Sequence, residues 1–160
     1  MSNHHDLSSY LVNRDGIDVI NGIKNGTVPL PPLLELFRPT LVEVSTGFVR
    51  LEATPDYEHL TLTGVAHGGW ALTLLDSAMG FAALTVLTGG SVCVTLETSA
   101  RLLKAIRPGG RGISITGKVE YQGRVPIEVS GRIEYDGQLL AIGNSSCLTV
   151  LPRKEPTDHS

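Results

Sequence analysis

Apolar and polar residues alternate along most of the chain after residue 90. This period of two is typical of strands that bury one face. The alternation, and the turn residues that interrupt it, predict four consecutive antiparallel strands at about 92–103, 113–121, 127–135 and 139–151. The pair Asp136-Gly137 between the last two strands is a strong signal for a two-residue hairpin.

The first part of the chain carries a different pattern. Gly16 to Lys24 predicts a short helix, and a second short helix is predicted at 33–37, after a proline-rich extended segment. From Val42 to Thr54 the alternation places Val49 and Leu51 on one face and predicts a single half-buried strand. We therefore expect an N-terminal extension, one domain and a disordered tail, over residues 1–41, 42–151 and 152–160.

The segment between these strands predicts one long, buried helix. The helix begins near Gly68 and ends before Gly89-Gly90. It is apolar on nearly every side. Leaving such a helix in water would forfeit much of the free energy of folding, so other elements must surround it. One strand, one buried helix and four further strands predict the α+β class, with a curved antiparallel β-sheet wrapped around one long central α-helix.

Length and composition limit the classes of function. A chain of 160 residues suits one domain, and a formal charge of -3 over mixed signs provides no basic surface for nucleic acid or a membrane. Cys93 and Cys147 lie in apolar strand segments without metal-ligand spacing, so we expect free thiols and no metal site. The N-terminus lacks the pattern of a secretory signal, which makes the cytoplasm the expected location.

A glycine-rich turn, Gly64 to Gly69, leads directly into the long helix. A helix start presents unpaired backbone N–H groups and the positive end of the helix dipole, which together stabilise a developing oxyanion. Gly68 and Gly69 would let a substrate carbonyl approach the backbone with no side chain in the way. Taken alone, the pattern favours an ordinary turn in which His67 only hydrogen-bonds at the helix start.

Asp76 adds the second chemical signal. It is the only formally charged side chain between Glu58 and Glu97, and it lies in the middle of an apolar helix. A buried carboxylate needs a compensating role. Burial also raises carboxylate basicity, which suits a general base or a nucleophile toward an activated carbonyl. The alternative is a structural aspartate that caps a neighbouring loop, but the glycine turn favours a functional one.

The order His67-Gly68-Gly69, six residues and then Asp76 resembles the active-site helix of hotdog-fold acyl-CoA thioesterases of the phenylacetate-degradation type. The related 4-hydroxybenzoyl-CoA thioesterases carry Glu at the place of Asp76. The resemblance extends over about two thirds of the chain, including the strands and the Pro31-Pro32 segment. It implies hydrolysis of an acyl-CoA thioester with an aromatic or medium-chain acyl group, and no cofactor besides the coenzyme A of the substrate.

The resemblance also implies a role for each residue of the motif. Asp76 would attack the thioester carbonyl or activate water, and the Gly68 N–H would hold the oxyanion. His67 would position the thioester or the turn, and Thr95 falls where relatives place a hydroxyl that orients water. Thr61 is a departure, because relatives commonly carry Asn or Gln there, and a hydroxyl lacks the reach and the combined donor and acceptor of an amide.

Further residues are candidates for substrate binding. The phosphates of coenzyme A need cations, and Lys104, Arg107 and Arg124 lie near predicted strand ends, where solvated basic residues are also common without a function. Trp70 and Met79 could line an acyl pocket from the helix, although their spacing is equally typical of core residues.

Two other functions fit the same fold. A hydratase or dehydratase would need an acid–base pair in one site, whereas about 13 Å of helix separates His67 from Asp76. A hotdog protein that binds an acyl-CoA or aromatic ligand without hydrolysis is the other alternative, which Thr61 favours. The helix spacing predicts a homodimer with shared active sites, where Gly68 of one chain meets Asp76 of the other. We expect a tetramer as a dimer of dimers.

Overall fold

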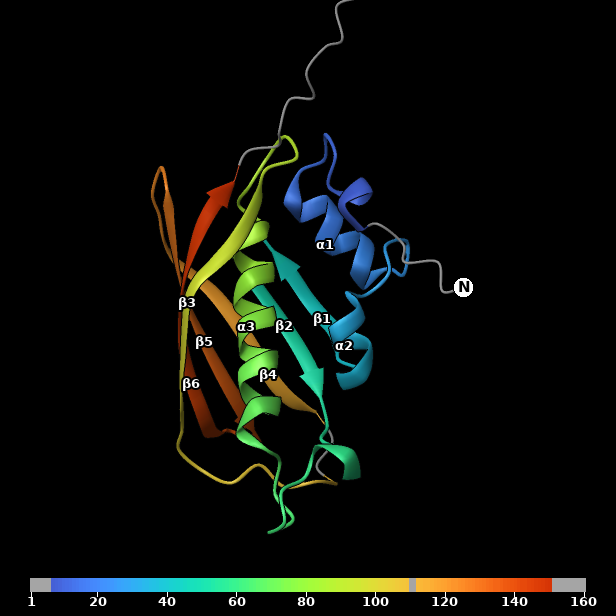
Figure 1. Cartoon of the computed structure of the whole chain (residues 1–160), viewed down its shortest axis with the longest axis vertical. Helices are drawn as coiled ribbons and strands as arrows, with labels where there is room; N and C mark the ends of the chain where they lie inside the picture. Colours follow the sequence, from blue (N-terminus) through green and yellow to red (C-terminus); the bar gives the residue numbers. More distant parts are fainter. Residues whose placement is uncertain (1–6, 110–111, 151–160) are drawn as a thin grey trace, which may run out of the picture.

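The computed structural model of the chain describes residues 7–109 and 112–150 of the 160. Figure 1 shows the long helix α3 beside the sheet, together with the short N-terminal helices α1 and α2. In chain order, the elements are η1 (Leu7–Tyr10), α1 (Gly16–Lys24), α2 (Pro32–Phe37), β1 (Thr40–Ser45), β2 (Phe48–Ala53), η2 (Tyr57–His59), α3 (Gly68–Leu84), β3 (Val92–Leu102), β4 (Ile113–Gln122), β5 (Pro126–Tyr135) and β6 (Gln138–Val150). The predicted long helix and the four strands after it are confirmed.

The strands form one antiparallel sheet in the order β1-β2-β4-β5-β6-β3. Between β5 and β6 the chain turns at Asp136 and Gly137, whose φ angles of 48° and 70° are those that a two-residue hairpin requires. β3 follows α3 in the chain but pairs with β6, so it occupies an edge of the sheet. This edge strand lies beside the middle of α3.

The prediction of a single strand over 42–54 is wrong. The structure has a hairpin instead, in which Ser45 pairs with Phe48. Gly47 makes the turn with a φ of 76°, and its N–H donates to the hydroxyl of Thr85 just after α3, at 2.8 Å. The apolar positions shift across the turn, from Val42 and Val44 to Val49 and Leu51, and the prediction of one strand overlooked this shift.

α3 packs closely on the sheet over a row of three glycines. Gly117 of β4 pairs with Gly131 of β5, which in turn pairs with Gly143 of β6. A Cβ atom on Gly117 would collide with the α3 backbone, and the side chains of Leu75 and Met79 fill the space above the other two glycines. These contacts fix the rotation of α3 about its axis. They therefore also set the direction in which Asp76, the residue after Leu75, points.

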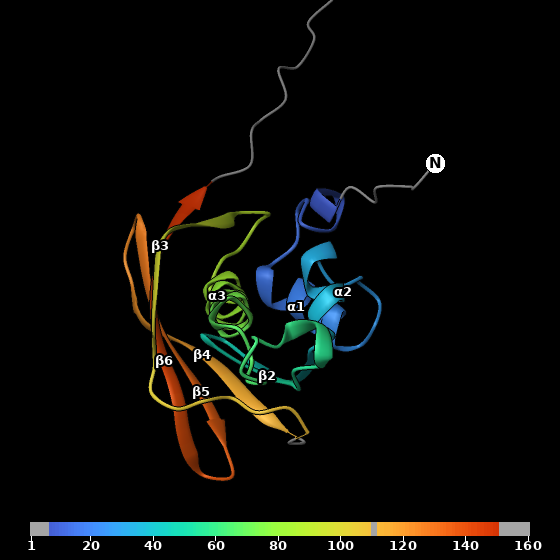
Figure 2. The same cartoon turned by 60° about the horizontal axis from the view of Figure 1, so that its bottom comes forward.

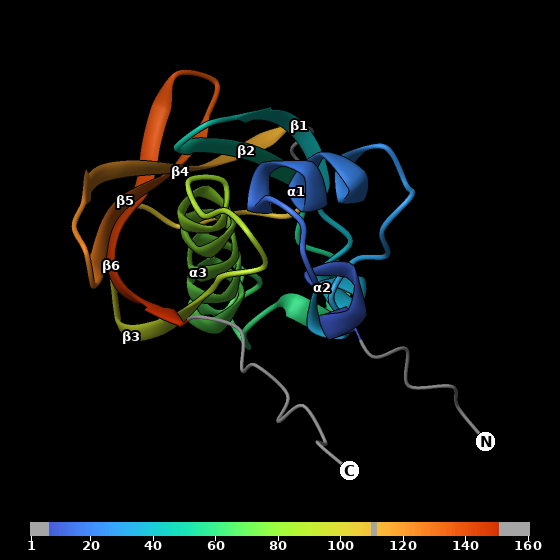
Figure 3. The same cartoon turned by 90° about the horizontal axis from the view of Figure 1, so that it is seen from above.

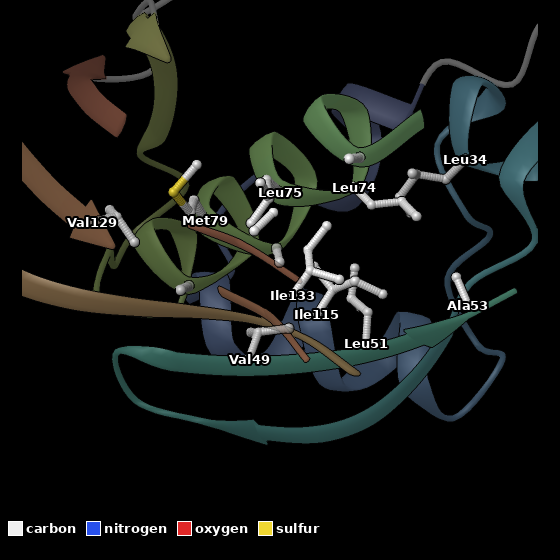
Figure 4. Close-up of a cluster of buried hydrophobic side chains, with 14 of the residues drawn as sticks. Leu34, Val49, Leu51, Ala53, Leu74, Leu75, Met79, Ile115, Val129 and Ile133 are labelled. Carbon is white, nitrogen blue, oxygen red and sulfur yellow. The ribbon is translucent and has the colours of Figure 1, made fainter. Parts of the chain in front are cut away.

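The N-terminal helices belong to the same hydrophobic core as the sheet. Ile20 of α1 and Leu34 of α2 are buried with Leu51, Leu74 and Ile115, the last four of which are drawn in Figure 4. Full burial of each such side chain contributes about 1.5–3 kcal/mol. Figure 2 and Figure 3 place α1 and α2 on the opposite side of α3 from β6 and β3. The helices α1 and α2 therefore do not cover the side of α3 that faces β3.

The architecture confirms the predicted α+β class, with an antiparallel sheet and one long helix, as in the hotdog fold. The sheet begins at Thr40, slightly before the expected start of the domain. The expected tail, 152–160, lies outside the described residues. Within the described part of the chain, no helix has the length and apolar character needed to cross a membrane.

Candidate active site

Asp76 lies halfway along α3, on the side that faces β3. Its Oδ1 atom accepts two hydrogen bonds from that strand, from the Thr98 hydroxyl at 2.8 Å and from the Thr95 hydroxyl at 3.2 Å. The Asp76 residue is partly buried, so the expectation of a buried carboxylate is met only in part in the single chain. The physical reason is that β3 is an edge strand, which leaves this side of the helix open to solvent.

A bulge in β3 brings both threonines to Asp76. The pairing of β3 with β6 shifts register between Thr95 and Glu97, which inserts one extra residue into β3. In a regular strand, residues three positions apart point to opposite faces. The bulge cancels this alternation and turns Thr98 to the same face as Thr95. Sequence reasoning identified Thr95 and missed Thr98, because a bulge leaves no mark in the apolar pattern.

A buried hydroxyl extends this contact into the sheet. Ser145 of β6 is 3% exposed, lies 3.0 Å from the Thr98 hydroxyl and donates to the Glu97 carbonyl at 3.1 Å. An ionised carboxylate only accepts, so Thr98 gives its single hydroxyl proton to Asp76. The Thr98 oxygen then accepts a hydrogen bond from the Ser145 hydroxyl. The Ser145 proton is shared between this oxygen and the Glu97 carbonyl. Two strands therefore hold the Asp76 carboxylate in one orientation.

Asp76 also lines a cavity of about 250 Å³ between α3 and the start of β3. No hydrogen bond to Oδ2 is found among the described residues, in contrast to Oδ1. Cys93 also lines this cavity and donates to the Gly80 carbonyl at 3.5 Å. The neighbouring Cys147 sulfur and burial raise the pKa of the Cys93 thiol. The Cys93 thiol is therefore held in its neutral form.

The start of α3 presents one unpaired amide. His67 is the N-cap residue, and its Nδ1 accepts from the Gly69 N–H at 3.1 Å, while the His67 carbonyl accepts from the Trp70 N–H at 2.9 Å. Within the described residues, the Gly68 N–H has no such acceptor. A Cβ atom on Gly68 would lie 3.2 Å from the Leu102 side chain. The Gly68 amide is thus available to a ligand at the positive end of the helix dipole.

Two predicted site residues lie away from Asp76. The Thr61 hydroxyl donates to the Val65 carbonyl at 3.1 Å and contacts the Thr63 hydroxyl at 2.9 Å, so it closes the turn before α3. Trp70 is 2% exposed, and its indole N–H has no partner in the described part of the chain. Trp70 belongs to the core and is absent from the lining of the Asp76 cavity.

The three predicted phosphate-binding cations lie at opposite ends of the molecule. Lys104 lines a cavity of about 280 Å³ beside the start of α3, and Arg107 lines an adjoining one of about 440 Å³. Arg124 follows β4, where the Gln122 amide donates to the Val86 carbonyl beyond the far end of α3, at 3.2 Å. Because α3 is about 25 Å long, Arg124 cannot contact a phosphate held by Lys104 and Arg107 of the same chain.

The fold and the site together define a hotdog-type protein equipped for carbonyl chemistry, with a free amide at the helix start and an oriented carboxylate in mid-helix. The chain belongs to the thioesterase superfamily, whose family model matches residues 63–142. The match begins in the turn before α3 and ends within β6. Membership supports thioester hydrolysis as the general class of reaction.

Individual relatives are similar over most of the chain. A curated protein of Archaeoglobus fulgidus, described as a candidate esterase, is 24% identical over 125 residues, which cover 78% of this chain and 79% of that protein. A solved candidate thioesterase of Ralstonia eutropha, described as phenylacetic acid degradation-related, has a TM-score of 0.75 at 20% identity, covering 81% of this chain and 98% of its own. A Streptococcus mutans structure bound to acetyl CoA has a TM-score of 0.64 at 24% identity, covering 72% and 91%. At these identities, the solved structures establish a shared fold.

Proposed function

We propose that the protein hydrolyses an acyl-CoA thioester to a free acid and CoA, with Asp76 as nucleophile or general base. The observation that carries this proposal is the asymmetry of the Asp76 carboxylate. Its Oδ1 is held by Thr95 and Thr98, whereas its Oδ2 is the oxygen left for the substrate or for water. Holding a reacting group in one orientation lowers the entropy cost of reaching the transition state.

Either role of Asp76 gives the same products. As a base, Oδ2 takes a proton from the water that bonds to the thioester carbon. As a nucleophile, Oδ2 bonds to that carbon itself, and water then hydrolyses the resulting anhydride. In both cases the carbonyl oxygen becomes negative and is stabilised by the Gly68 N–H, a contribution of about 10²–10³ in rate for one oxyanion donor. The C–S bond then breaks, and the CoA thiolate takes up a proton.

We propose that each active site is shared by two chains. Residues 68 and 76 are separated by about 12 Å along α3, too far to contact one carbonyl together. A symmetric homodimer with antiparallel facing helices would bring Gly68 of one chain to Asp76 of the other. The edge strand β3 supports this assembly, since Val94 and Leu96 are 50% and 63% exposed, and an uncovered apolar edge favours pairing with another chain.

Further assembly completes the proposal. Two dimers associate into a tetramer, and in each chain the sheet curves around α3 as in other hotdog proteins.

The Streptococcus mutans relative bound to acetyl CoA supports coenzyme A as the substrate carrier. Lys104 and Arg107, both exposed beside the start of α3, are the cations proposed for its phosphates. The reaction needs no other cofactor, and we place it in the cytoplasm.

A panel of acyl-CoA substrates tests the function. Hydrolysis releases CoA, whose thiol is detected with Ellman's reagent. A hydratase would change the acyl chain without releasing thiol, and a binding protein would yield no product. Release of thiol by the wild type and not by Asp76→Asn is the expected result. Thiol release that persists in Asp76→Asn would assign the activity to another group.

A further inference from the structure

The N-terminal segment reaches the Asp76 cavity. Leu11, in the turn between η1 and α1, lines this cavity together with Phe81, Leu84 and Val92. Two hydrogen bonds between β3 and α3 show how the lining residues follow one another along the helix. Thr95 donates to Asp76, and Cys93 donates to Gly80, one turn further on. The carboxylate therefore lies at one end of the cavity, and the apolar side chains lie at the other.

Several backbone contacts hold this segment in place. The Gly90 N–H donates to the Arg14 carbonyl at 2.9 Å, and the Gly16 N–H donates to the Leu87 carbonyl at 2.9 Å. The Gly89 N–H donates to the Asp15 carboxylate at 3.0 Å. The chain passes so close to Gly90 that a Cβ atom there would lie 3.0 Å from the Leu11 carbonyl. The position of Leu11 is thus set by the loop that joins α3 to β3.

We propose that Leu11 forms the end wall of the acyl-binding cavity and limits the length of the acyl group, an inference that rests on the acyl-CoA hydrolysis proposed above. The thioester carbon must lie within bonding reach of the Asp76 carboxylate. From there, the cavity continues past Phe81 and Val92 to Leu11. The pantetheine arm carries amides, whose burial against apolar side chains without hydrogen bonds is costly. The acyl group therefore occupies the apolar end of the cavity near Leu11, and the CoA moiety extends out of the end near Asp76.

The lining also selects the chemical class of the acyl group. Among the described residues, Asp76 is the one charged side chain that lines the cavity. A second carboxylate at the far end of an acyl chain would be buried against the apolar wall, so dicarboxylic acyl groups are excluded. The volume of about 250 Å³ is below the roughly 300–1,000 Å³ of pockets for drug-sized ligands. The substrate class is a neutral, apolar acyl group of short to medium length.

Dependence on acyl-chain length tests the role of Leu11. The variants are Leu11→Ala, which lengthens the cavity, and Leu11→Phe, which shortens it. Val12→Ala is the matched control, because Val12 is 61% exposed and does not line the cavity. For each protein, kcat/KM is measured with butanoyl-, hexanoyl-, octanoyl- and decanoyl-CoA. The dissociation constants of the corresponding non-hydrolysable alkyl-CoA thioethers are measured in parallel, with the thermal unfolding temperature as a check of folding.

The two Leu11 variants should shift length preference in opposite directions. Leu11→Ala should raise the decanoyl-to-butanoyl ratio of kcat/KM about tenfold or more, which is the effect of about one methylene in a fitted pocket. Leu11→Phe should lower this ratio, and Val12→Ala should leave it unchanged. Unchanged ratios in both Leu11 variants would overturn the proposal, and so would shifts in the same direction. If the wild type hydrolyses no acyl-CoA, the proposed function fails, and the thioether constants still decide whether Leu11 sets the length.

Discussion

Replacing Thr98 with valine removes the shorter of the two hydrogen bonds to Asp76 and disturbs little else. Valine has nearly the shape of threonine, so no cavity results, and Ser145 keeps the Glu97 carbonyl as its acceptor at 3.1 Å. A hydrogen bond to a charged group contributes about 1.5–3 kcal/mol. If this energy holds the carboxylate in its reactive orientation, Thr98→Val should lower kcat about 10- to 100-fold. Thr95→Val should lower kcat less, because its bond to Asp76 is longer, at 3.2 Å.

A serine variant separates this role from a purely structural one. Thr98→Ser keeps the hydroxyl that donates to Asp76 and loses only a methyl group. It should therefore retain most of the wild-type kcat, whereas Thr98→Val should not.

Two results would refute the role of Thr98. One is a Thr98→Val enzyme with wild-type kcat, which would mean that Thr95 alone orients the carboxylate. The other is a Thr98→Ser enzyme as impaired as Thr98→Val, which would trace the defect to packing and not to the hydroxyl. Thermal unfolding, measured by circular dichroism, serves as the control that both variants are equally stable.

Three further changes have defined outcomes. Asp76→Asn should lower kcat about 100-fold or more with little change in KM, as steady-state kinetics will show, since the carboxylate acts mainly in the transition state. Gly117→Ala should destabilise the fold by about 1–3 kcal/mol in urea unfolding, because its methyl group would push α3 off the sheet. Gly80→Ala, with open space at its Cβ position, serves as its control and should not destabilise. Thr61→Asn should fold and raise turnover of phenylacetyl-CoA, and a loss of turnover on every acyl-CoA would contradict the placement of this residue.

Much of the fold could be predicted from the sequence, because its signals are local. The predicted start of the long helix at Gly68 agrees with the structure. The predicted hairpin at Asp136-Gly137 also agrees. The turn at Gly47 was not predicted, although the apolar positions shift between Val44 and Val49. Element type follows from the periodicity of several residues, whereas this turn depends on a single glycine with a positive φ.

The site was harder to predict, because its geometry depends on contacts between distant segments. The bulge in β3 that turns Thr98 toward Asp76 appears only when β3 is paired with β6. The apolar residues Val94 and Leu96 face outward, where an alternating pattern alone favours burial. Leu11 lies far from Asp76 in sequence and lines the same cavity only through the packing of the N-terminal segment. Pairing partners and packing of this kind are not encoded in local periodicity.

In the proposed homodimer, Asp76 of one chain and Gly68 of the other act on the same thioester. Two inactive variants test it directly, Asp76→Ala and Gly68→Pro. Proline removes the proposed donor N–H at the first helical position, where it is usually tolerated. The preceding His67 already has the extended conformation that proline requires, with a φ of -63° and a ψ of 143°.

Mixing the two variants after unfolding, and refolding them together, gives the decisive measurement. Each variant alone should be inactive while remaining folded and dimeric. In an equal mixture, half of the dimers are hybrids, and each hybrid carries one intact site and one doubly defective site. The mixture should therefore recover about a quarter of the wild-type rate of CoA release. A folded, dimeric mixture that stays inactive would contradict the shared site and the oxyanion role of Gly68.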